Sequence, residues 1–223
     1  MAVAVGTITE AESSSTSSLS FAHEAAGANR GLIVGVASYN AEPTGVTFDS
    51  VAMTKEGSIK NTTNNDWTSL WSLIAPNTGT GKNVVVSFAA AEEVVAGAVS
   101  FTGVNQTDMA NTYASGTGNT TAPSLTVTSE ADAIVIDTLG FFNMDSASAD
   151  TPQTERWKQI NLNAFESGMG STKAGASPSV TMSWTINSAV QWTYSAISVT
   201  PAAGAAVAAP MRVRQLALTG IGM

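Results

Sequence analysis

The sequence contains no cysteine and a single histidine, His23. Without cysteine, the chain forms no disulfide and offers neither a thiol nucleophile nor a thiolate ligand for a metal. A Ser-His-Asp triad would have to use His23, and no serine lies in the Gly-x-Ser-x-Gly turn that exposes such a nucleophile. These absences predict a protein that is not an enzyme, with His23 at the end of a strand or in a loop.

Charged residues are also scarce, at 12% of the chain against roughly 25% in typical soluble proteins. Lys and Arg number nine against 17 Asp and Glu, which gives a net charge of −8. Nucleic acids and anionic membrane surfaces both attract clustered basic residues, so we expect neither as a partner. The hydrophobic share of 43% is large enough for a packed core and excludes a disordered chain.

Long hydrophobic runs are missing. No stretch approaches the roughly 20 apolar residues of a membrane span, so no membrane insertion is expected. The start of the chain (MAVAVGTITE) has no basic group and no apolar segment of signal-peptide length. Either a signal has been removed, or the protein leaves the cytoplasm by another route, of which virion assembly is one.

The periodic patterns that are present predict strands, because short runs rich in Val, Ile, Thr and aromatic residues are separated by Gly, Asn and Pro turns. A polar corner at residues 91–93 is expected to join two of these strands. Residues 153–162 fit a helix or an edge strand. The expected strands cover 31–38, 46–53, 67–75, 83–89, 94–101, 125–128, 133–142, 179–186 and 191–200, with shorter candidates at 3–9, 18–22 and 164–173.

This series of strands predicts an all-β fold, an antiparallel β-sandwich or jelly-roll with short terminal arms. Residues 1–18 are expected to form an N-terminal arm or edge strand, and residues 19–201 the sandwich. After Pro201 the chain becomes rich in Ala, so residues 202–223 are interpreted as a linker followed by a C-terminal docking arm.

The segment of residues 105–123 is rich in Thr, Asn and Gly and is interpreted as an exposed loop that faces a ligand, with Asn105, Asp108 and Tyr113 in it. Trp157 lies in the polar stretch Glu-Arg-Trp-Lys, which makes it the first candidate among the five tryptophans for an exposed, ligand-facing position. Packing is favoured for Trp157, and a stacking platform for a sugar is the alternative.

The C-terminal arm, residues 211–223, combines arginines with apolar residues (MRVRQLALTGIGM). We expect it to dock on a partner or a neighbouring copy by strand addition, since it has no obvious core of its own to join. A frayed or self-packed tail is the alternative. The residues assigned to docking are Arg212, Val213, Arg214, Leu216 and Leu218.

Two polar clusters, residues 61–66 and 105–108, allow a structural calcium ion, with ordinary Asx turns as the alternative. No other cofactor is expected. Residues 79–82 (GTGK) superficially match a phosphate loop, but the position of its first glycine is Pro76 and Asn83 follows the lysine. The segment is therefore interpreted as a hairpin turn.

Several motifs resemble a β-sandwich module that recurs in phage structural proteins and in large bacterial surface proteins. The resemblance covers roughly residues 28–201 and rests on strand and turn patterns, so it implies a display or adhesion role and carries over no catalytic residue. The motifs are NRGLIVGV at 29–36, VTFDSVAM at 46–53, LWSLIAPNTG at 70–79, VVVSF at 84–88, AGAVSFTGVNQT at 96–107, SW at 183–184 and AISVTP at 196–201.

The leading hypothesis is a phage virion protein, such as a capsid decoration protein, head fibre or tail-associated subunit. Its partners would be the major capsid or tail protein and copies of itself, because virion parts are built by repetition. One alternative is a carbohydrate-binding or adhesive module of a bacterial surface protein, with Trp157 and residues 105–123 on a host surface glycan. A self-assembling extracellular filament subunit is another.

Overall fold

The computed structural model describes residues 1–142, 146–160 and 166–203, and in these ranges the chain forms fifteen strands and no helix. The strands pair antiparallel and form three sheets. The all-β antiparallel sandwich predicted from the sequence is confirmed. No helix in the described residues has the length and hydropathy to cross a membrane.

The first half of the chain folds into a seven-stranded sheet with the order β4-β3-β7-β2-β6-β5, in which β1 also pairs with β7. The sheet curls, because β7 pairs with β3 through residues 84–87 and with β2 through residues 94–101. Apolar side chains such as Leu32, Val34 and Phe48 fill the inside of the curl. The strands are β1 (Ala4–Ala22), β2 (Gly31–Tyr39), β3 (Gly45–Phe48), β4 (Val51–Ala52), β5 (Thr54–Lys60), β6 (Asp66–Ile74) and β7 (Asn83–Thr102).

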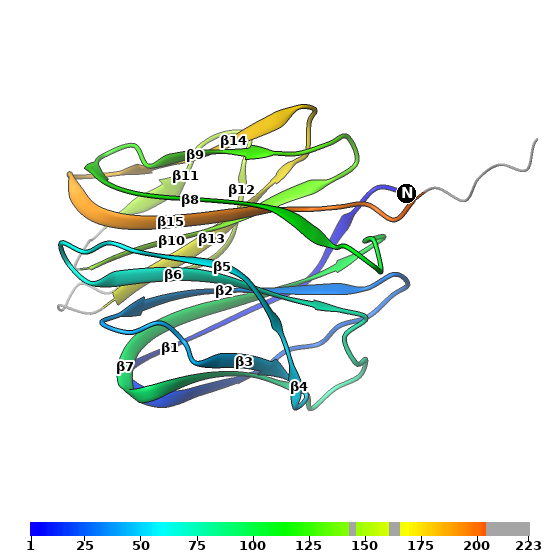
Figure 1. Cartoon of the computed structure of the whole chain (residues 1–223), viewed down its shortest axis with the longest axis horizontal. Helices are drawn as coiled ribbons and strands as arrows, with labels where there is room; N and C mark the ends of the chain where they lie inside the picture. The colour runs from blue at the N-terminus through cyan, green and yellow to red at the C-terminus, as the bar shows by residue number, and fades with distance from the viewer. Residues whose placement is uncertain (143–145, 161–165, 204–223) are drawn as a thin grey trace, which may run out of the picture.

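The second half forms a five-stranded sheet, β12-β13-β10-β15-β8, and a three-stranded sheet, β11-β14-β9. Leu139, Met182 and Trp184 belong to the core between these two sheets. Figure 1 shows the resulting stack, with the three-stranded sheet at the top and the curled part of the first sheet at the bottom. The strands are β8 (Ala110–Thr120), β9 (Ser124–Thr128), β10 (Ile134–Phe142), β11 (Ala147–Ala149), β12 (Thr154–Gln159), β13 (Glu166–Ala174), β14 (Ser179–Ile186) and β15 (Val190–Val199).

The two halves repeat one topology. The order β5-β6-β2-β7-β1 in the first half matches β12-β13-β10-β15-β8 in the second. The register matches as well, since Gly31 on β2 pairs with Phe101 on β7, and Ile134 on β10 pairs with Val199 on β15. In the first half, the long strands β1 and β7 continue into the curled part of the sheet, which is its second layer. In the second half, the separate strands β9 and β14 occupy the equivalent positions in the three-stranded sheet. The chain therefore stacks two equivalent sandwiches face to face.

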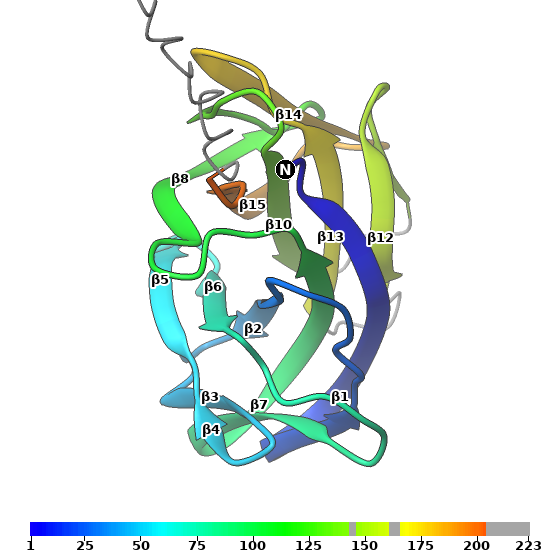
Figure 2. The same cartoon turned by 90° about the vertical axis from the view of Figure 1, so that its right-hand side faces the viewer.

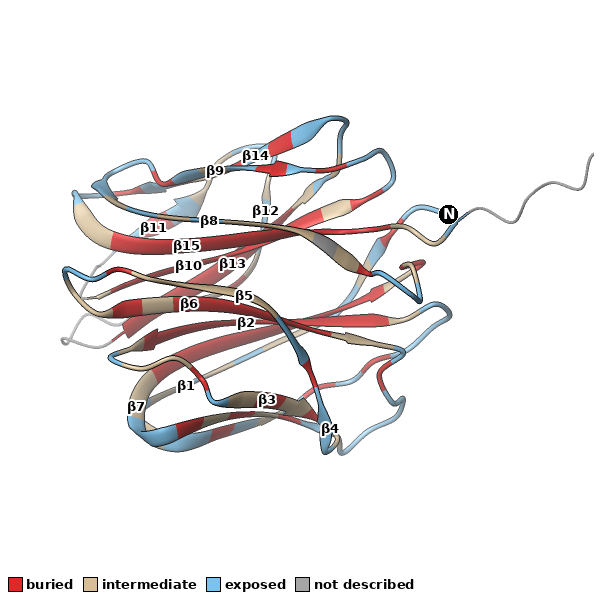
Figure 3. Ribbon diagram, viewed as in Figure 1, coloured by how far each residue is buried: buried red, intermediate tan, exposed pale blue. Residues whose placement is uncertain are grey.

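The strands β2 and β10 face each other where the halves meet. The rings of Tyr39 and Phe142 stack there, with centroids 4.7 Å apart. A side chain at Gly35 would overlap Thr138 on the opposite sheet, so glycine is needed for the sheets to approach this closely. A third core fills the rest of the interface, and Figure 3 shows buried residues running through the inner sheets of both halves.

Trp157 on β12 lies in this interface and is only 3% exposed, which agrees with the packing favoured from the sequence and rules out the exposed platform. Its indole ring covers the backbone at Gly97 on β7 and at Gly170 on β13. The ligand-facing alternative was wrong, because the polar neighbours of Trp157 in the sequence reflect only that β12 is an edge strand. The opposite half of the molecule covers the inner face of that strand.

Two other expectations are corrected, and one open alternative is decided. Residues 105–123 are not one exposed loop, because β8 occupies 110–120 and pairs along its length with β15. The two strands expected at 83–89 and 94–101 are one continuous strand, β7, and the polar corner between them is its bend. Of the two alternatives for residues 153–162, the edge strand is found, as β12 at Thr154–Gln159.

The N-terminal residues 1–18 lie mainly in β1, which pairs with β7 from Ala4 to Ala22. Register shifts between Ser13 and Thr16 and between Thr16 and Ser18 mark the place where this pair of strands bends. Such irregularities increase the local twist and allow one strand to serve two layers.

Replacing Gly97 by Ala is expected to destabilise the protein, because the added Cβ would overlap the Trp157 ring. Overpacking of this kind costs about 1–3 kcal/mol in the free energy of unfolding. The matched control is Gly45→Ala on β3, where a Cβ meets nothing within 4 Å. Urea unfolding measures both variants, and equal stabilities for the two would contradict the packing assigned to Trp157.

Candidate functional site

The residues predicted to face a ligand do not come together. Trp157 lies on β12 and Tyr113 on β8, which are the two opposite edges of the five-stranded sheet. Tyr113 is partly buried, covers the backbone at Gly57 and has its hydroxyl 2.9 Å from Ser195 Oγ. Trp157 is enclosed, so neither aromatic ring forms an open stacking platform.

Asn105 and Asp108 lie in the turn before β8. The Asn105 Oδ1 atom accepts hydrogen bonds from the Thr107 backbone N–H and hydroxyl, both at 2.9 Å, and from the Asp108 N–H at 3.3 Å. This pattern is an Asx turn, which stabilises the loop without an ion. Asn61 likewise accepts a hydrogen bond from the Thr63 N–H at 2.9 Å in the other predicted calcium cluster. In the described ranges, no group of three or more His, Asp or Glu residues is arranged to hold a metal.

The predicted docking residues Arg212, Val213, Arg214, Leu216 and Leu218 lie outside the described residues. The chain leading to them is fixed as far as Ala202. The Ala202 N–H donates to the Gly103 carbonyl at 2.7 Å, and the amino group of Met1 donates to the Ala202 carbonyl at 3.3 Å. Residue 1 and residue 202 therefore lie side by side, at the end of the molecule that faces the viewer in Figure 2.

Asp137 on β10 is a buried carboxylate that the sequence analysis missed. It accepts hydrogen bonds from the Tyr194 hydroxyl at 2.6 Å, the Trp184 indole N–H at 3.1 Å and the Ser171 N–H at 2.5 Å. Burial raises the pKa of Asp137 to about 6, while these donors hold the rise in check. The carboxylate is enclosed in the core of the second half, where it links three strands.

A second pair of buried carboxyl groups, Asp66 and Glu166, lies where the halves meet. The two residues occupy equivalent places in the repeat, since Asp66 pairs with Tyr39 and Glu166 with Phe142. Burial raises the pKa of Asp66 to about 7, and it raises the pKa of Glu166 well above its usual value together with repulsion from Asp66. Their titrations are linked, because ionising one carboxyl makes it costly to ionise the other.

Glu93 completes this cluster, and its Oε2 atom accepts the Glu166 backbone N–H at 3.0 Å. Asp66 and Glu166 are each the first residue of a strand and lie beside polar residues in the sequence. From the sequence alone, such a carboxyl group is expected to be exposed to solvent at the end of a strand. The one feature that could have indicated their burial is that they occupy equivalent positions in the two halves. That equivalence can be recognised only once the order of the strands in the sheets is known. Because the pKa values of Asp66 and Glu166 are raised, the cluster makes the stability of the folded protein depend on pH.

The single histidine, His23, is 2% exposed and follows β1 directly. Its Nδ1 atom lies 2.8 Å from the Thr9 hydroxyl, and burial lowers its pKa to about 4. The imidazole is therefore neutral at physiological pH and packs edge-on against Phe48. Its Nε2 atom has no hydrogen-bond partner among the described residues, so no carboxylate there completes a triad with His23 and Thr9.

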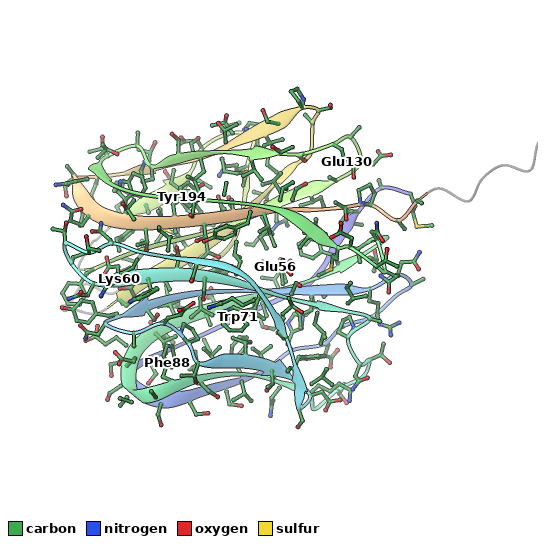
Figure 4. All side chains as sticks on the ribbon, in the orientation of Figure 1. Glu56, Lys60, Trp71, Phe88, Glu130 and Tyr194 are labelled. Atoms are coloured by element: carbon green, nitrogen blue, oxygen red, sulfur yellow. The ribbon has the colours of Figure 1, made fainter. Side chains whose placement is uncertain are left out.

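Two surface grooves lie at equivalent places in the two halves. The Glu56 groove, about 420 Å³ in volume, lies beside β5 and β6, and Figure 4 labels Glu56. It is lined by Thr54, Glu56, Ser72, Leu73, Ile74 and residues 107–110. The Arg156 groove, about 550 Å³, lies beside β12 and β13 and is lined by Ala2, Val3, residues 132–134, Pro152, Thr154, Arg156 and residues 172–175. Neither groove reaches Asp66, Asp137 or Glu166.

Comparison with known proteins gave no relative. No protein-family model matches the chain, and neither the curated proteins nor the solved structures contain a match. The resemblance to a β-sandwich module of phage and bacterial surface proteins therefore stays a prediction.

Replacing Glu166 by Gln tests the buried carboxyl cluster. An acid with a raised pKa keeps its proton in the folded state while the unfolded chain releases it, so it lowers the stability of the wild type as the pH rises above about 4.5. We expect the free energy of unfolding of Glu166→Gln to improve relative to wild type, by up to about 1.4 kcal/mol for each pH unit above that value. Urea unfolding between pH 4 and pH 8 provides the measurement.

Comparison with wild type at each pH cancels the contributions of Asp137 and His23, which both proteins share. Glu24→Gln, at an exposed position after β1, is the control for the loss of one carboxylate outside the interface. A difference between Glu166→Gln and wild type that stays constant with pH would contradict the assignment.

Proposed function

We propose that this chain is a non-enzymatic structural subunit of a virion, of the capsid decoration, head-fibre or tail-associated kind. It docks on the major capsid or tail protein, or on copies of itself, through residues 211–223 and presents the sandwich outward. The observation that carries the proposal is the position of the chain ends. Met1 is hydrogen-bonded to Ala202, so the described part of the chain begins and ends at the same place on the body.

The surface of the body supports a docking role for that segment. Among the described residues, the only large hydrophobic side chains classed as exposed are Met1 and Val51. Stable interfaces bury a cluster of apolar and aromatic groups, and two separated side chains do not supply one. The apolar residues Val213, Leu216 and Leu218 offer what the body lacks.

The repeated sandwich suits a displayed part. Three stacked cores hold the sheets together. A body of this kind keeps its shape while its ends make the contacts.

The alternative of a glycan-binding module loses the platform that the sequence suggested, because Trp157 is enclosed between the halves. The filament alternative uses the same C-terminal segment but joins copies without a shell. Sizing at several concentrations separates the two assemblies, since an open-ended filament grows with concentration and a closed oligomer does not.

Deleting residues 211–223 is expected to remove the protein from purified particles, because the segment supplies the docking contacts. The body should keep the thermal stability of the full chain, since the last strand ends at Val199. Quantitative mass spectrometry of the particles measures occupancy, and thermal unfolding checks the fold.

The matched control replaces residues 202–210 by a Gly/Ser linker of equal length. This variant keeps the docking residues and the tether and is expected to remain on the particle. Unchanged occupancy of the deletion variant would refute docking through this segment.

A further inference from the structure

Arg156 is a partly buried cation without a carboxylate partner. Its Nε atom donates to the Thr172 hydroxyl at 2.6 Å, and burial lowers its pKa. The three ion pairs in the described residues join Lys55, Lys82 and Lys158 to other carboxylates. Partial desolvation of a guanidinium that has no carboxylate partner costs free energy, and an anionic ligand would recover part of it.

A local irregularity of the backbone aims Arg156 into its groove. On β12 the pairing with β13 shifts between Glu155 and Trp157, so Arg156 is the extra residue of a bulge. Bulges commonly redirect a side chain, and they recur beside binding sites. The bulge turns the guanidinium toward Thr172 while Trp157 enters the interface.

The first half of the molecule has a bulge at the position equivalent to that of Arg156. On β5 the pairing with β6 shifts between Lys55 and Gly57, so Glu56 is the equivalent bulge residue. Glu56 accepts a hydrogen bond from the Ser72 hydroxyl, as Arg156 donates one to the Thr172 hydroxyl. The same backbone device therefore carries opposite charges in the two grooves.

We propose that the Arg156 groove binds the carboxylate of an acidic sugar, such as a hexuronic acid. The two terminal nitrogens of the guanidinium match a planar carboxylate in a two-bonded fork. The groove volume of about 550 Å³ lies within the usual size of ligand pockets, roughly 300–1,000 Å³.

The charges around the groove select a monoanion. The other basic residue of the lining, Lys173, donates its ammonium to the Thr181 carbonyl at 2.7 Å, and Asp132 also lines the groove. One guanidinium neutralises the single charge of a carboxylate but only half of the charge of a phosphate dianion. The net charge of −8 on the chain repels the remaining negative charge of a phosphate.

The remaining lining favours a polyhydroxylated ring. Asp132 and Thr154 bring side-chain oxygens that form hydrogen bonds with hydroxyl groups, while Val3 and Pro152 bring small apolar surfaces. The lining of this groove includes no residue of the segment 211–223, so the proposal goes beyond the structural role.

The test is a titration of the full chain with D-glucuronic acid, followed by amide chemical shifts in solution. Weak, saturable binding is expected, with shifts confined to residues 154–156 and 172–175. The equivalent residues 54–56 and 72–74 should not move. D-glucose, which lacks the carboxylate, and sodium sulfate, which lacks the ring, should each bind at least about tenfold more weakly.

Arg156→Gln is expected to lower the affinity for glucuronic acid at least about tenfold, and Arg156→Lys to lower it as well, because lysine keeps the charge but loses the fork. Glu56→Gln, the matched change in the other groove, should leave the affinity unchanged. Equal binding of glucose or sulfate, or full affinity in Arg156→Gln, would overturn the proposal. So would an absence of shifts at residues 154–156 in the wild type, a result that does not depend on how any variant folds.

Discussion

The close approach of two sheets across glycine-lined surfaces is the constraint on which the rest of this structure depends. Trp157 reaches the backbone of both halves only because Gly97 and Gly170 leave room for its ring. Dispersion contacts of this kind fall off steeply with distance, so a gap of one methyl group would cost much of the attraction. The interface in turn fixes where each edge strand lies, and with it the two grooves at the bulges.

The repeat explains both what the halves share and where they differ. Equivalent positions face each other across the interface, which is why the stacked rings of Tyr39 and Phe142 and the acids Asp66 and Glu166 occur as matched pairs. The pair of rings stabilises the interface, but the two carboxylates repel each other when both are ionised. Burial resolves this conflict by holding protons on the pair, at the cost of a stability that depends on pH.

The sequence was sufficient for the fold class and for most strands, because alternating Val, Thr and aromatic residues report a local period. It was insufficient where burial comes from distant contacts. Trp157 sits among charged neighbours and is nevertheless enclosed, and β8 is built from Thr, Ser, Asn and Gly because one of its edges faces solvent. The Arg156 groove was equally hidden, since a bulge depends on pairing with a second strand and leaves no signature in β12 alone.

The position of the Arg156 groove relates the two proposals. Ala2 and Val3 line it, and Met1 is bonded to Ala202, so the groove lies close to the end of the described chain. Under the proposed docking, a ligand bound there would belong to the docking surface or to a molecule held against it. The Tyr39 and Phe142 rings lie at the opposite ends of β2 and β10 from Gly31 and from the groove-lining residue Ile134. The two proposals together would therefore place the groove end of the sandwich toward the partner.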